Sequence, residues 1–172
     1  MNRKKRILVA GIGNIFLGDD GFGSEVARQL VAEALPSEVS VKDFGIRSYD
    51  LAYAMMDGYD VTILVDTTSQ GAAPGTVYLI EPDLNQLDQF AAGTADAHTM
   101  DPIAALRILR ASGSNVGKLY LIGCEPATLE AEDGQFELSE SVKAAVPRAI
   151  DLIKSLVMDL LEQDGIAPLK SA

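Results

Sequence analysis

The sequence is poor in the residues that build disulfides and thiolate metal sites. Cys124 is the only cysteine among 172 residues, which excludes an internal disulfide and a cysteine-built zinc site. His98 is the only histidine. Lysine and arginine number 14 against 25 acidic residues, for a net charge of −11. A nucleic-acid-binding face needs the opposite balance, so an acidic surface favours a basic or cationic partner.

Long apolar runs are also missing. No stretch approaches the ~20 apolar residues that cross a bilayer. A basic start at residues 3–6 leads into the short apolar run Ile7–Ala10, which is too short for a signal peptide. We therefore expect a soluble, cytoplasmic protein, and we interpret residues 3–6 as a solvated chain start and not as a binding arm.

The chain alternates between strand-like and helix-like patterns, which predicts one α/β domain. We expect strands at Arg6–Gly11, Val39–Phe44, Val61–Val65, Thr76–Ile80 and Lys118–Ile122. We expect helices at Asp19–Leu35, Asp50–Met56, Asp101–Ala111 and Ser139–Gln163, the last kinked or restarted at Pro147. The fold class is three-layered: a mostly parallel, twisted sheet of about five strands lies between helices. The domain spans residues 1–164, and residues 165–172 form a flexible tail.

A glycine-rich turn follows the first predicted strand and is open to two interpretations. A dinucleotide-binding fingerprint has two residues between its second and third glycines, whereas four separate Gly13 from Gly18. Asp19 and Asp20 would also repel a pyrophosphate at the helix start. Asp43 does occupy roughly the ribose-binding position, so the cofactor hypothesis stays as an alternative.

Paired acids at a helix start are often N-caps, and this explains one of Asp19 and Asp20. Capping does not explain the surrounding glycines Gly18, Gly21 and Gly23. Glycines at these positions would allow the backbone to lie close to a bound group. Asp66 directly follows the apolar run, so it lies at the carboxyl edge where α/β sheets bind ligands. A cap or turn role for Asp66 is the alternative.

His98 lies in a predicted loop ahead of a helix, from which it could reach the same edge. Two carboxylates and an imidazole suit nickel or zinc with open positions for water or substrate. Distance along the chain prevents spacing alone from establishing that Asp20, Asp66 and His98 converge.

The order of these motifs resembles the hydrogenase maturation proteases, endopeptidases that process the large subunit of [NiFe]-hydrogenases. The resemblance covers most of the chain. Its anchors are Gly11-Ile-Gly-Asn14, Gly18-Asp-Asp-Gly21-x-Gly23, Asp66, His98, Gly123-Cys-Glu-Pro126-x-x-Leu129-Glu130 and Leu138-Ser139-x-x-Val142.

This resemblance implies a phosphorylase/hydrolase-like fold and a metal-contacting, catalytic trio of Asp20, Asp66 and His98. It also implies weaker substrate contacts at Gly13, Asn14 and Asp43. Asp20 is glutamate in some relatives, and Phe44 replaces a glycine of the family's Asp-Gly-Gly run.

The implied activity is removal of a C-terminal extension from the large-subunit precursor after nickel insertion, with the substrate's own nickel as the recognition element. Nickel is thus the expected metal, with no nucleotide, and the protein is expected to act as a monomer. Either a metal-polarised water or an aspartate base could drive hydrolysis.

Two rival functions remain, and one of them, a binding module, uses the same ligands. Cys124 and His98 could form a cysteine-protease pair, although a lone cysteine is more often buried. A binding module could recognise nickel-loaded partner without cutting it. Tyr49, Tyr53, Met55 and Met56 could line a substrate groove, but we expect them to pack a helix onto the sheet.

Overall fold

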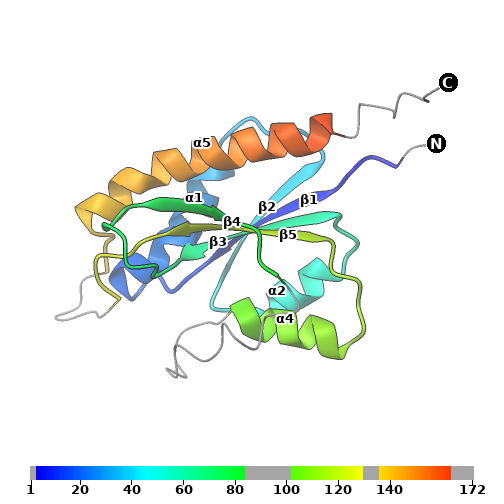
Figure 1. The fold of residues 1–172 in the computed structure, drawn as a ribbon, viewed down its shortest axis with the longest axis horizontal. Coiled ribbons are helices and arrows are strands. Elements are labelled where there is room, and N and C mark those ends of the chain that lie inside the picture. Colours follow the sequence, from blue (N-terminus) through cyan, green and yellow to red (C-terminus); the bar gives the residue numbers. More distant parts are fainter. Residues whose placement is uncertain (1–2, 84–101, 130–135, 164–172) are drawn as a thin grey trace.

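Five strands form one sheet in the order β2-β1-β3-β5-β4 in the computed structural model, which describes residues 3–83, 102–129 and 136–163 (Figure 1). The strands are β1 (Ile7–Ile12), β2 (Val39–Gly45), β3 (Val61–Thr67), β4 (Val77–Ile80) and β5 (Lys118–Cys124). The pairs β1–β2, β1–β3 and β3–β5 are parallel, whereas β4 runs antiparallel to β5 at the edge. The predicted α/β class and mostly parallel sheet are confirmed.

Helices cover both faces of the sheet, as the predicted three layers require. The described helices are the 3₁₀ helix η1 (Gly18–Gly21) and the α-helices α1 (Phe22–Leu30), α2 (Ser48–Met55), α4 (Pro102–Ala111) and α5 (Glu140–Glu162). One hydrophobic cluster joins α1 and α5 to the sheet, and a second joins α2 and α4 to the opposite face. Figure 1 shows these two layers on either side of the strands.

Strand β1 shows why the two cores are separate. Ile7 and Val9 belong to the α1–α5 cluster, whereas Leu8, Ala10 and Ile12 belong to the α2–α4 cluster. Successive side chains of a strand point to opposite faces, so a continuous apolar run serves both layers. All six residues of β1 are buried.

The first helical segment differs from the prediction at both ends. The expected helix at Asp19–Leu35 is a 3₁₀ turn, Gly18–Gly21, followed by an α-helix that ends at Leu30. Its three glycines in six residues, Gly18, Gly21 and Gly23, weaken α-helical propensity at the start. The 3₁₀ turn matters for the site, because it carries both acids.

Helix α5 continues through Pro147 from Glu140 to Glu162, so the restart suggested by that proline is wrong. Proline removes one backbone donor and tolerates helical φ. Burial of an apolar stripe along α5 against the sheet sustains the remaining turns. The stripe consists of Val142, Ala145, Val146, Ala149, Ile150, Ile153, Val157 and Leu160.

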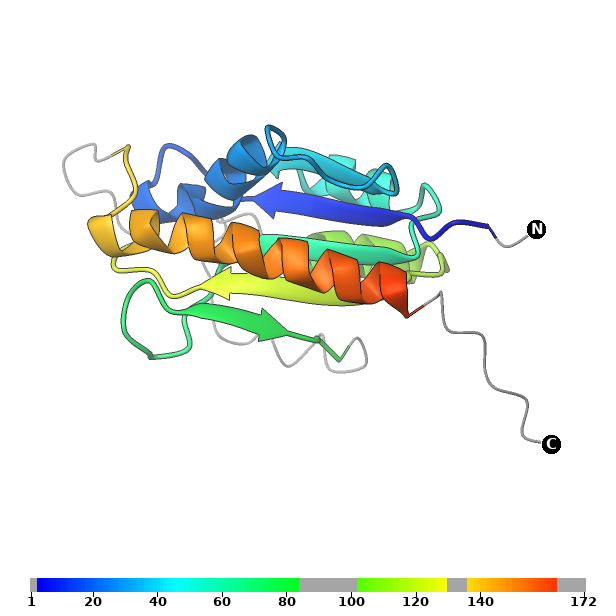
Figure 2. The same cartoon turned by 90° about the horizontal axis from the view of Figure 1, so that it is seen from above.

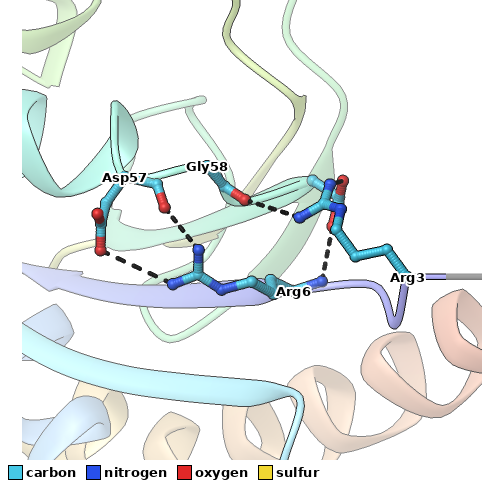
Figure 3. Close-up of polar contacts among 5 residues, drawn as sticks. Arg3, Arg6, Asp57 and Gly58 are labelled. Atoms are coloured by element: carbon cyan, nitrogen blue, oxygen red, sulfur yellow. Dashed lines mark hydrogen bonds and ion pairs between the residues drawn. The ribbon is translucent and has the colours of Figure 1, made fainter.

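The basic residues near the chain start are held by protein groups at the amino edge of the sheet (Figure 3). Arg3 forms an ion pair with Asp60 and donates to the carbonyl of Gly58. Arg6 donates through its backbone N–H to Asp60 at 2.7 Å and through its guanidinium to the carbonyl of Asp57 at 2.6 Å. The side chains of Arg3 and Lys4 are 64% and 79% exposed, so the start is solvated as predicted, and these contacts also anchor it at the edge opposite the candidate site.

Two further expectations concern membrane-spanning helices and the end of the chain. Within the described ranges, no helix is both long and apolar enough to cross a membrane. The expected flexible tail, residues 165–172, lies outside the described residues.

Candidate active site

The carboxyl ends of β1 and β3 lie side by side at the centre of the sheet. Residues Ile7–Gly11 pair in register with Val61–Val65. From β1 the chain crosses to β2 on one side, while β3, β5 and β4 lie on the other. This is the switch point at which open α/β sheets bind ligands. Figure 2 shows β1 and β5 pointing toward this edge and β4 pointing away from it.

Asp20 lies at this edge on η1 and is only 7% exposed. The N–H of Asn14 donates to its Oδ2 at 3.1 Å, and the Thr67 hydroxyl donates to the same carboxylate. Burial is the dominant effect on this group and raises the pKa of Asp20, while the two hydrogen bonds lower it. A carboxyl with a raised pKa is a stronger proton acceptor than an ordinary aspartate.

Asp66 is the penultimate residue of β3 and is 8% exposed. Its Oδ1 accepts the N–H of Thr67 at 2.8 Å. Thr67 thus contacts both acids, one through its hydroxyl and one through its backbone. The chain between β3 and β4, residues 68–76, contains no helix, so the alternative N-cap role for Asp66 is wrong.

Glycines allow the backbone to bring Asp20 to the sheet. A Cβ on Gly13 would lie 1.9 Å from the carbonyl oxygen of Asp20, and the φ of Gly13 is +144°. A Cβ on Gly23 would lie 2.0 Å from the carbonyl oxygen of Val65. Only glycine permits such approaches, so the sequence Gly-x-Gly-Asn…Gly-x-Gly packs η1 and α1 directly onto β1 and β3.

The weaker candidates lie beside Asp20. Gly13 and Asn14 contact it through their backbones, and the Asn14 Oδ1 accepts the N–H of Phe16 at 3.0 Å. Asp43 is exposed at the end of β2, where its Oδ1 accepts the hydroxyl of Ser24 at 2.8 Å and the N–H of Gly45 at 2.9 Å. The structure therefore brings these three residues to the same edge as both acids.

Asp19 has a different role from the N-cap considered for it. Neither η1 nor α1 has a side-chain cap. The carboxylate of Asp19 is fully buried and accepts hydrogen bonds from Ala127, Thr128 and Ser139. This anchoring was not predicted, because its donors lie more than 100 residues away in the sequence.

The backbone of the same turn bears on the dinucleotide alternative, which stays a prediction. A phosphate at a helix start is bound by free backbone N–H groups. Here the N–H of Asn14, in the loop between β1 and η1, donates to the Asp20 carboxylate. Asp43 meanwhile binds Ser24 and Gly45.

Cys124 is a core residue, as the commoner interpretation of a lone cysteine predicts. Its side chain is fully buried in the α1–α5 cluster. Burial, with a smaller contribution from the charge of Asp19, raises the pKa of the thiol to about 11. A nucleophilic cysteine needs a lowered pKa, so the cysteine-protease rival fails on this residue.

Glu125 is a fourth buried acid in the described residues, beside Asp19, Asp20 and Asp66, and its role was not predicted from the sequence. Its carboxylate accepts the N–H groups of Gln70 and Gly71 at 2.8 and 3.2 Å and the hydroxyl of Tyr78 at 2.7 Å. These bonds lower the pKa of Glu125. Glu125 therefore holds the loop that leaves β3 just after Asp66.

His98 lies outside the described residues, so its predicted convergence with the two aspartates is untested. Within the described ranges, no three side chains of histidine, cysteine, aspartate or glutamate are grouped to hold a metal ion. What the structure shows is two of the three expected site residues, a pair of buried aspartates joined through Thr67.

Comparisons with known proteins agree on one class. A family model described as hydrogenase maturation protease matches residues 24–156. A putative hydrogenase maturation protease of Methanocaldococcus jannaschii is 35% identical over 152 residues, covering 88% of this chain and 96% of that protein. The hydrogenase 2 maturation protease of Escherichia coli is 28% identical over 162 residues, covering 94% and 93%.

Solved structures give the same result. The hydrogenase maturating endopeptidase HybD from Escherichia coli superposes with a TM-score of 0.76 at 27% identity, covering 90% of this chain and 93% of that one. A hydrogenase 2 maturation peptidase from a Thaumarchaeota archaeon has a TM-score of 0.67 at 32% identity, covering 89% and 98%.

The open α/β sheet and these likenesses define the class of protein as a peptidase. More particularly, the chain belongs to the hydrogenase maturation protease family. The family match includes Asp66 and His98, whereas Asp20 precedes its first residue, Ser24.

Proposed function

We propose that this peptidase removes the C-terminal extension of a [NiFe]-hydrogenase large-subunit precursor after nickel has been inserted. The proposal extends the family membership to a substrate and to a site. Its trio is Asp20, Asp66 and His98, which contact the nickel of the precursor. The observation that carries it is the pair of buried aspartates at the switch point, bridged by Thr67.

The donor set suits such a substrate. Carboxylate and imidazole are accepted ligands of divalent nickel, and three protein ligands leave positions open for groups of the precursor. Two carboxylates also favour a cation electrostatically, and burial strengthens this attraction. Nickel carried by the precursor supplies positive charge that polarises nearby groups.

Helix α4 supports the inclusion of His98. It leads through residues 112–117 to the amino end of β5, so it runs back along the sheet from the carboxyl edge (Figure 1). Its first residue, Pro102, is four positions after His98 in the sequence. This order favours a histidine that reaches the edge of Asp20 and Asp66.

Asp20 suits the proton transfer that peptide hydrolysis requires. Water adds to the peptide carbonyl carbon, the carbon–nitrogen bond breaks, and a proton moves to the amine that leaves. The Asp20 carboxylate, held at this edge by Asn14, can accept the proton of the attacking water and pass it to that amine. Asp66 then serves mainly to hold the cation.

The surface around this edge suits a protein substrate. Ile15, Phe16, Ile46, Tyr49 and Phe136 are large, apolar and more than half exposed. They belong to the loops after β1 and β2, the start of α2 and the approach to α5. A pocket of about 320 Å³ adjoins η1 and includes Ile15 and Phe136 in its lining. Clustered exposed apolar side chains are typical of interaction surfaces.

Cleavage of the nickel-loaded precursor tests the proposal. Asp66→Asn and His98→Ala are expected to reduce the cleavage rate by at least about 100-fold, because each removes a ligand. Asp60→Asn is the matched control, since Asp60 lies at the opposite edge beside Arg3 and Arg6. Normal cleavage by either site variant would refute the assigned site.

A second arm of the experiment varies the substrate. The wild-type protein is incubated with precursor prepared with and without nickel, and the shortened product is measured by mass. Cleavage only of the loaded form is expected. Equal cleavage of both forms would refute recognition of nickel, and binding without any product would favour a pure binding module.

A further inference from the structure

Asp19 takes no part in the proposed chemistry, yet its surroundings are built for a carboxylate. Its Oδ2 accepts the N–H groups of Ala127 and Thr128 at 2.9 and 3.2 Å and the hydroxyl of Ser139 at 2.9 Å. Its Oδ1 accepts the N–H of Ser139 at 2.7 Å. All four partners are donors, and the side chain is fully buried.

These donors come from parts of the chain more than a hundred residues away. Ala127 and Thr128 follow β5, and Ser139 is the N-cap residue of α5. The negative charge of Asp19 also lies where the dipole of α5 favours an anion. Asp19 thus joins η1 to the α5 layer.

Asp20, the next residue, faces a different layer. Its carboxylate is bonded to Asn14 and Thr67, at the ends of β1 and β3. In a 3₁₀ helix successive side chains are about 120° apart. A single short turn therefore directs one acid to α5 and the other to the sheet edge.

The turn itself has little intrinsic stability. It is four residues long, begins and ends with glycine, and uses the poorer hydrogen-bond geometry of a 3₁₀ helix. The position of η1 must therefore come from tertiary contacts. Four of these contacts are the hydrogen bonds of Asp19 to α5 and to the residues after β5.

We propose that Asp19 is a positioning residue for Asp20. By fixing η1 to Ala127, Thr128 and Ser139, it holds the Asp20 carboxylate against Asn14 and Thr67. The proposal rests on the proposed function only in treating Asp20 as a site residue. It assigns different roles to two adjacent aspartates.

The variant Asp19→Asn tests this role with almost no change in volume. Its amide nitrogen would meet an N–H or hydroxyl donor in either orientation, so at least one donor loses its partner. We expect the cleavage rate at saturating precursor to fall about 10- to 100-fold, because a small misplacement of a reacting group is costly. Ser139→Ala, which removes only the hydroxyl bond, should give a smaller loss in the same direction.

Hydrogen exchange provides a readout that does not depend on cleavage. The N–H of Asn14 is bonded to Asp20 and not to Asp19. In Asp19→Asn and Ser139→Ala its exchange should accelerate, together with that of Ala127 and Thr128. In the control Asp60→Asn, acceleration should be confined to the amino edge around Arg6, with cleavage unchanged.

The two readouts separate the two proposals. If Asn14 exchange accelerates while even the wild-type protein cleaves no precursor, the positioning role stands and the proposed function fails. If the wild-type protein cleaves precursor but Asp19→Asn cleaves as fast, with unchanged Asn14 exchange, the positioning role is overturned. Acceleration limited to Ala127 and Thr128 would also overturn it, since it would show a purely local anchoring of η1 to α5.

Discussion

Tyr78 donates a hydrogen bond of 2.7 Å to Oε2 of Glu125 and thereby joins the antiparallel edge strand β4 to the residue that follows β5. The same carboxylate holds Gln70 and Gly71 in the loop between β3 and β4. One buried acid, Glu125, therefore holds both the edge strand β4 and the loop that follows Asp66.

The first prediction concerns the alkaline stability of this contact. Burial and the charge of Glu125 raise the pKa of Tyr78 to about 12. Because the folded pKa lies above the ordinary value of 10.0, the stabilisation is complete below pH 10 and is lost as the pH rises through about 12. Tyr78→Phe should lower the free energy of unfolding at neutral pH and flatten its alkaline decline. Denaturant titrations across this pH range would measure both, and an unchanged alkaline decline would contradict the prediction.

The second prediction contrasts the adjacent acids. Burial raises the pKa of Asp20, so the folded state carries a cost for its ionised form at neutral pH. Asp20→Asn should raise the free energy of unfolding by about 1 kcal/mol at neutral pH while abolishing cleavage. The gain should shrink as the pH falls through the raised pKa and vanish below the ordinary value of 3.8. Denaturation of the substrate-free protein at several pH values measures it.

Asp19→Asn provides the internal comparison for that experiment. It should lower the free energy of unfolding, by about 1–3 kcal/mol, because it leaves a buried donor without a partner. Equal effects of the two variants on the free energy of unfolding would contradict the assignment of Asp20 to the chemistry and Asp19 to the anchoring of η1.

The third prediction uses the contact between Gly13 and the backbone of Asp20. Gly13→Ala would place a Cβ 1.9 Å from the Asp20 carbonyl oxygen, so η1 must shift. We expect a loss of cleavage of about 100-fold. Gly113→Ala is the control, because Gly113 also has a positive φ, +69°, but its Cβ would meet nothing within 4 Å. Cleavage and thermal unfolding should be measured for both, and equal cleavage rates would contradict a role for close packing at Gly13.

The fourth prediction addresses docking of the precursor. Phe16 and Tyr49 are 63% and 69% exposed near the candidate site. Phe16→Ala and Tyr49→Ala should weaken precursor binding about tenfold with little effect on stability. Val31→Ala is the control, because Val31 is 66% exposed but follows the last residue of α1, toward the amino edge. Binding is measured by titration with labelled precursor, and equal affinities of the three variants would contradict the assigned surface.

The strands and the position of Asp66 could be predicted because burial on both faces requires a continuous apolar run. Val61–Val65 reads as a central strand, and the acid after it must lie at the carboxyl edge. Helix α2 shows where this reasoning stops. Met55 is buried as expected, but Tyr49 and Tyr53 are exposed, so the packing interpretation is wrong for both tyrosines. Tyrosine is amphipathic, so the sequence alone does not decide whether it lies on the buried or the exposed face of a helix.

The roles of the two acids in Gly18-Asp-Asp-Gly21 could not be separated from the sequence either. The difference between Asp19 and Asp20 depends on the donors Ala127, Ser139 and Asn14, which only the folded chain brings near. The antiparallel direction of β4 likewise depends on its pairing with β5 and not on its own residues.

The buried thiol of Cys124 is a natural probe for opening of the native structure. It is the only sulfhydryl in the chain, it is fully covered, and burial raises its pKa to about 11. A thiol reagent can therefore react only when the α1–α5 core opens, and each molecule gives a single signal when it does. The rate of labelling would count spontaneous openings of the native state, with no engineered probe and no substrate present.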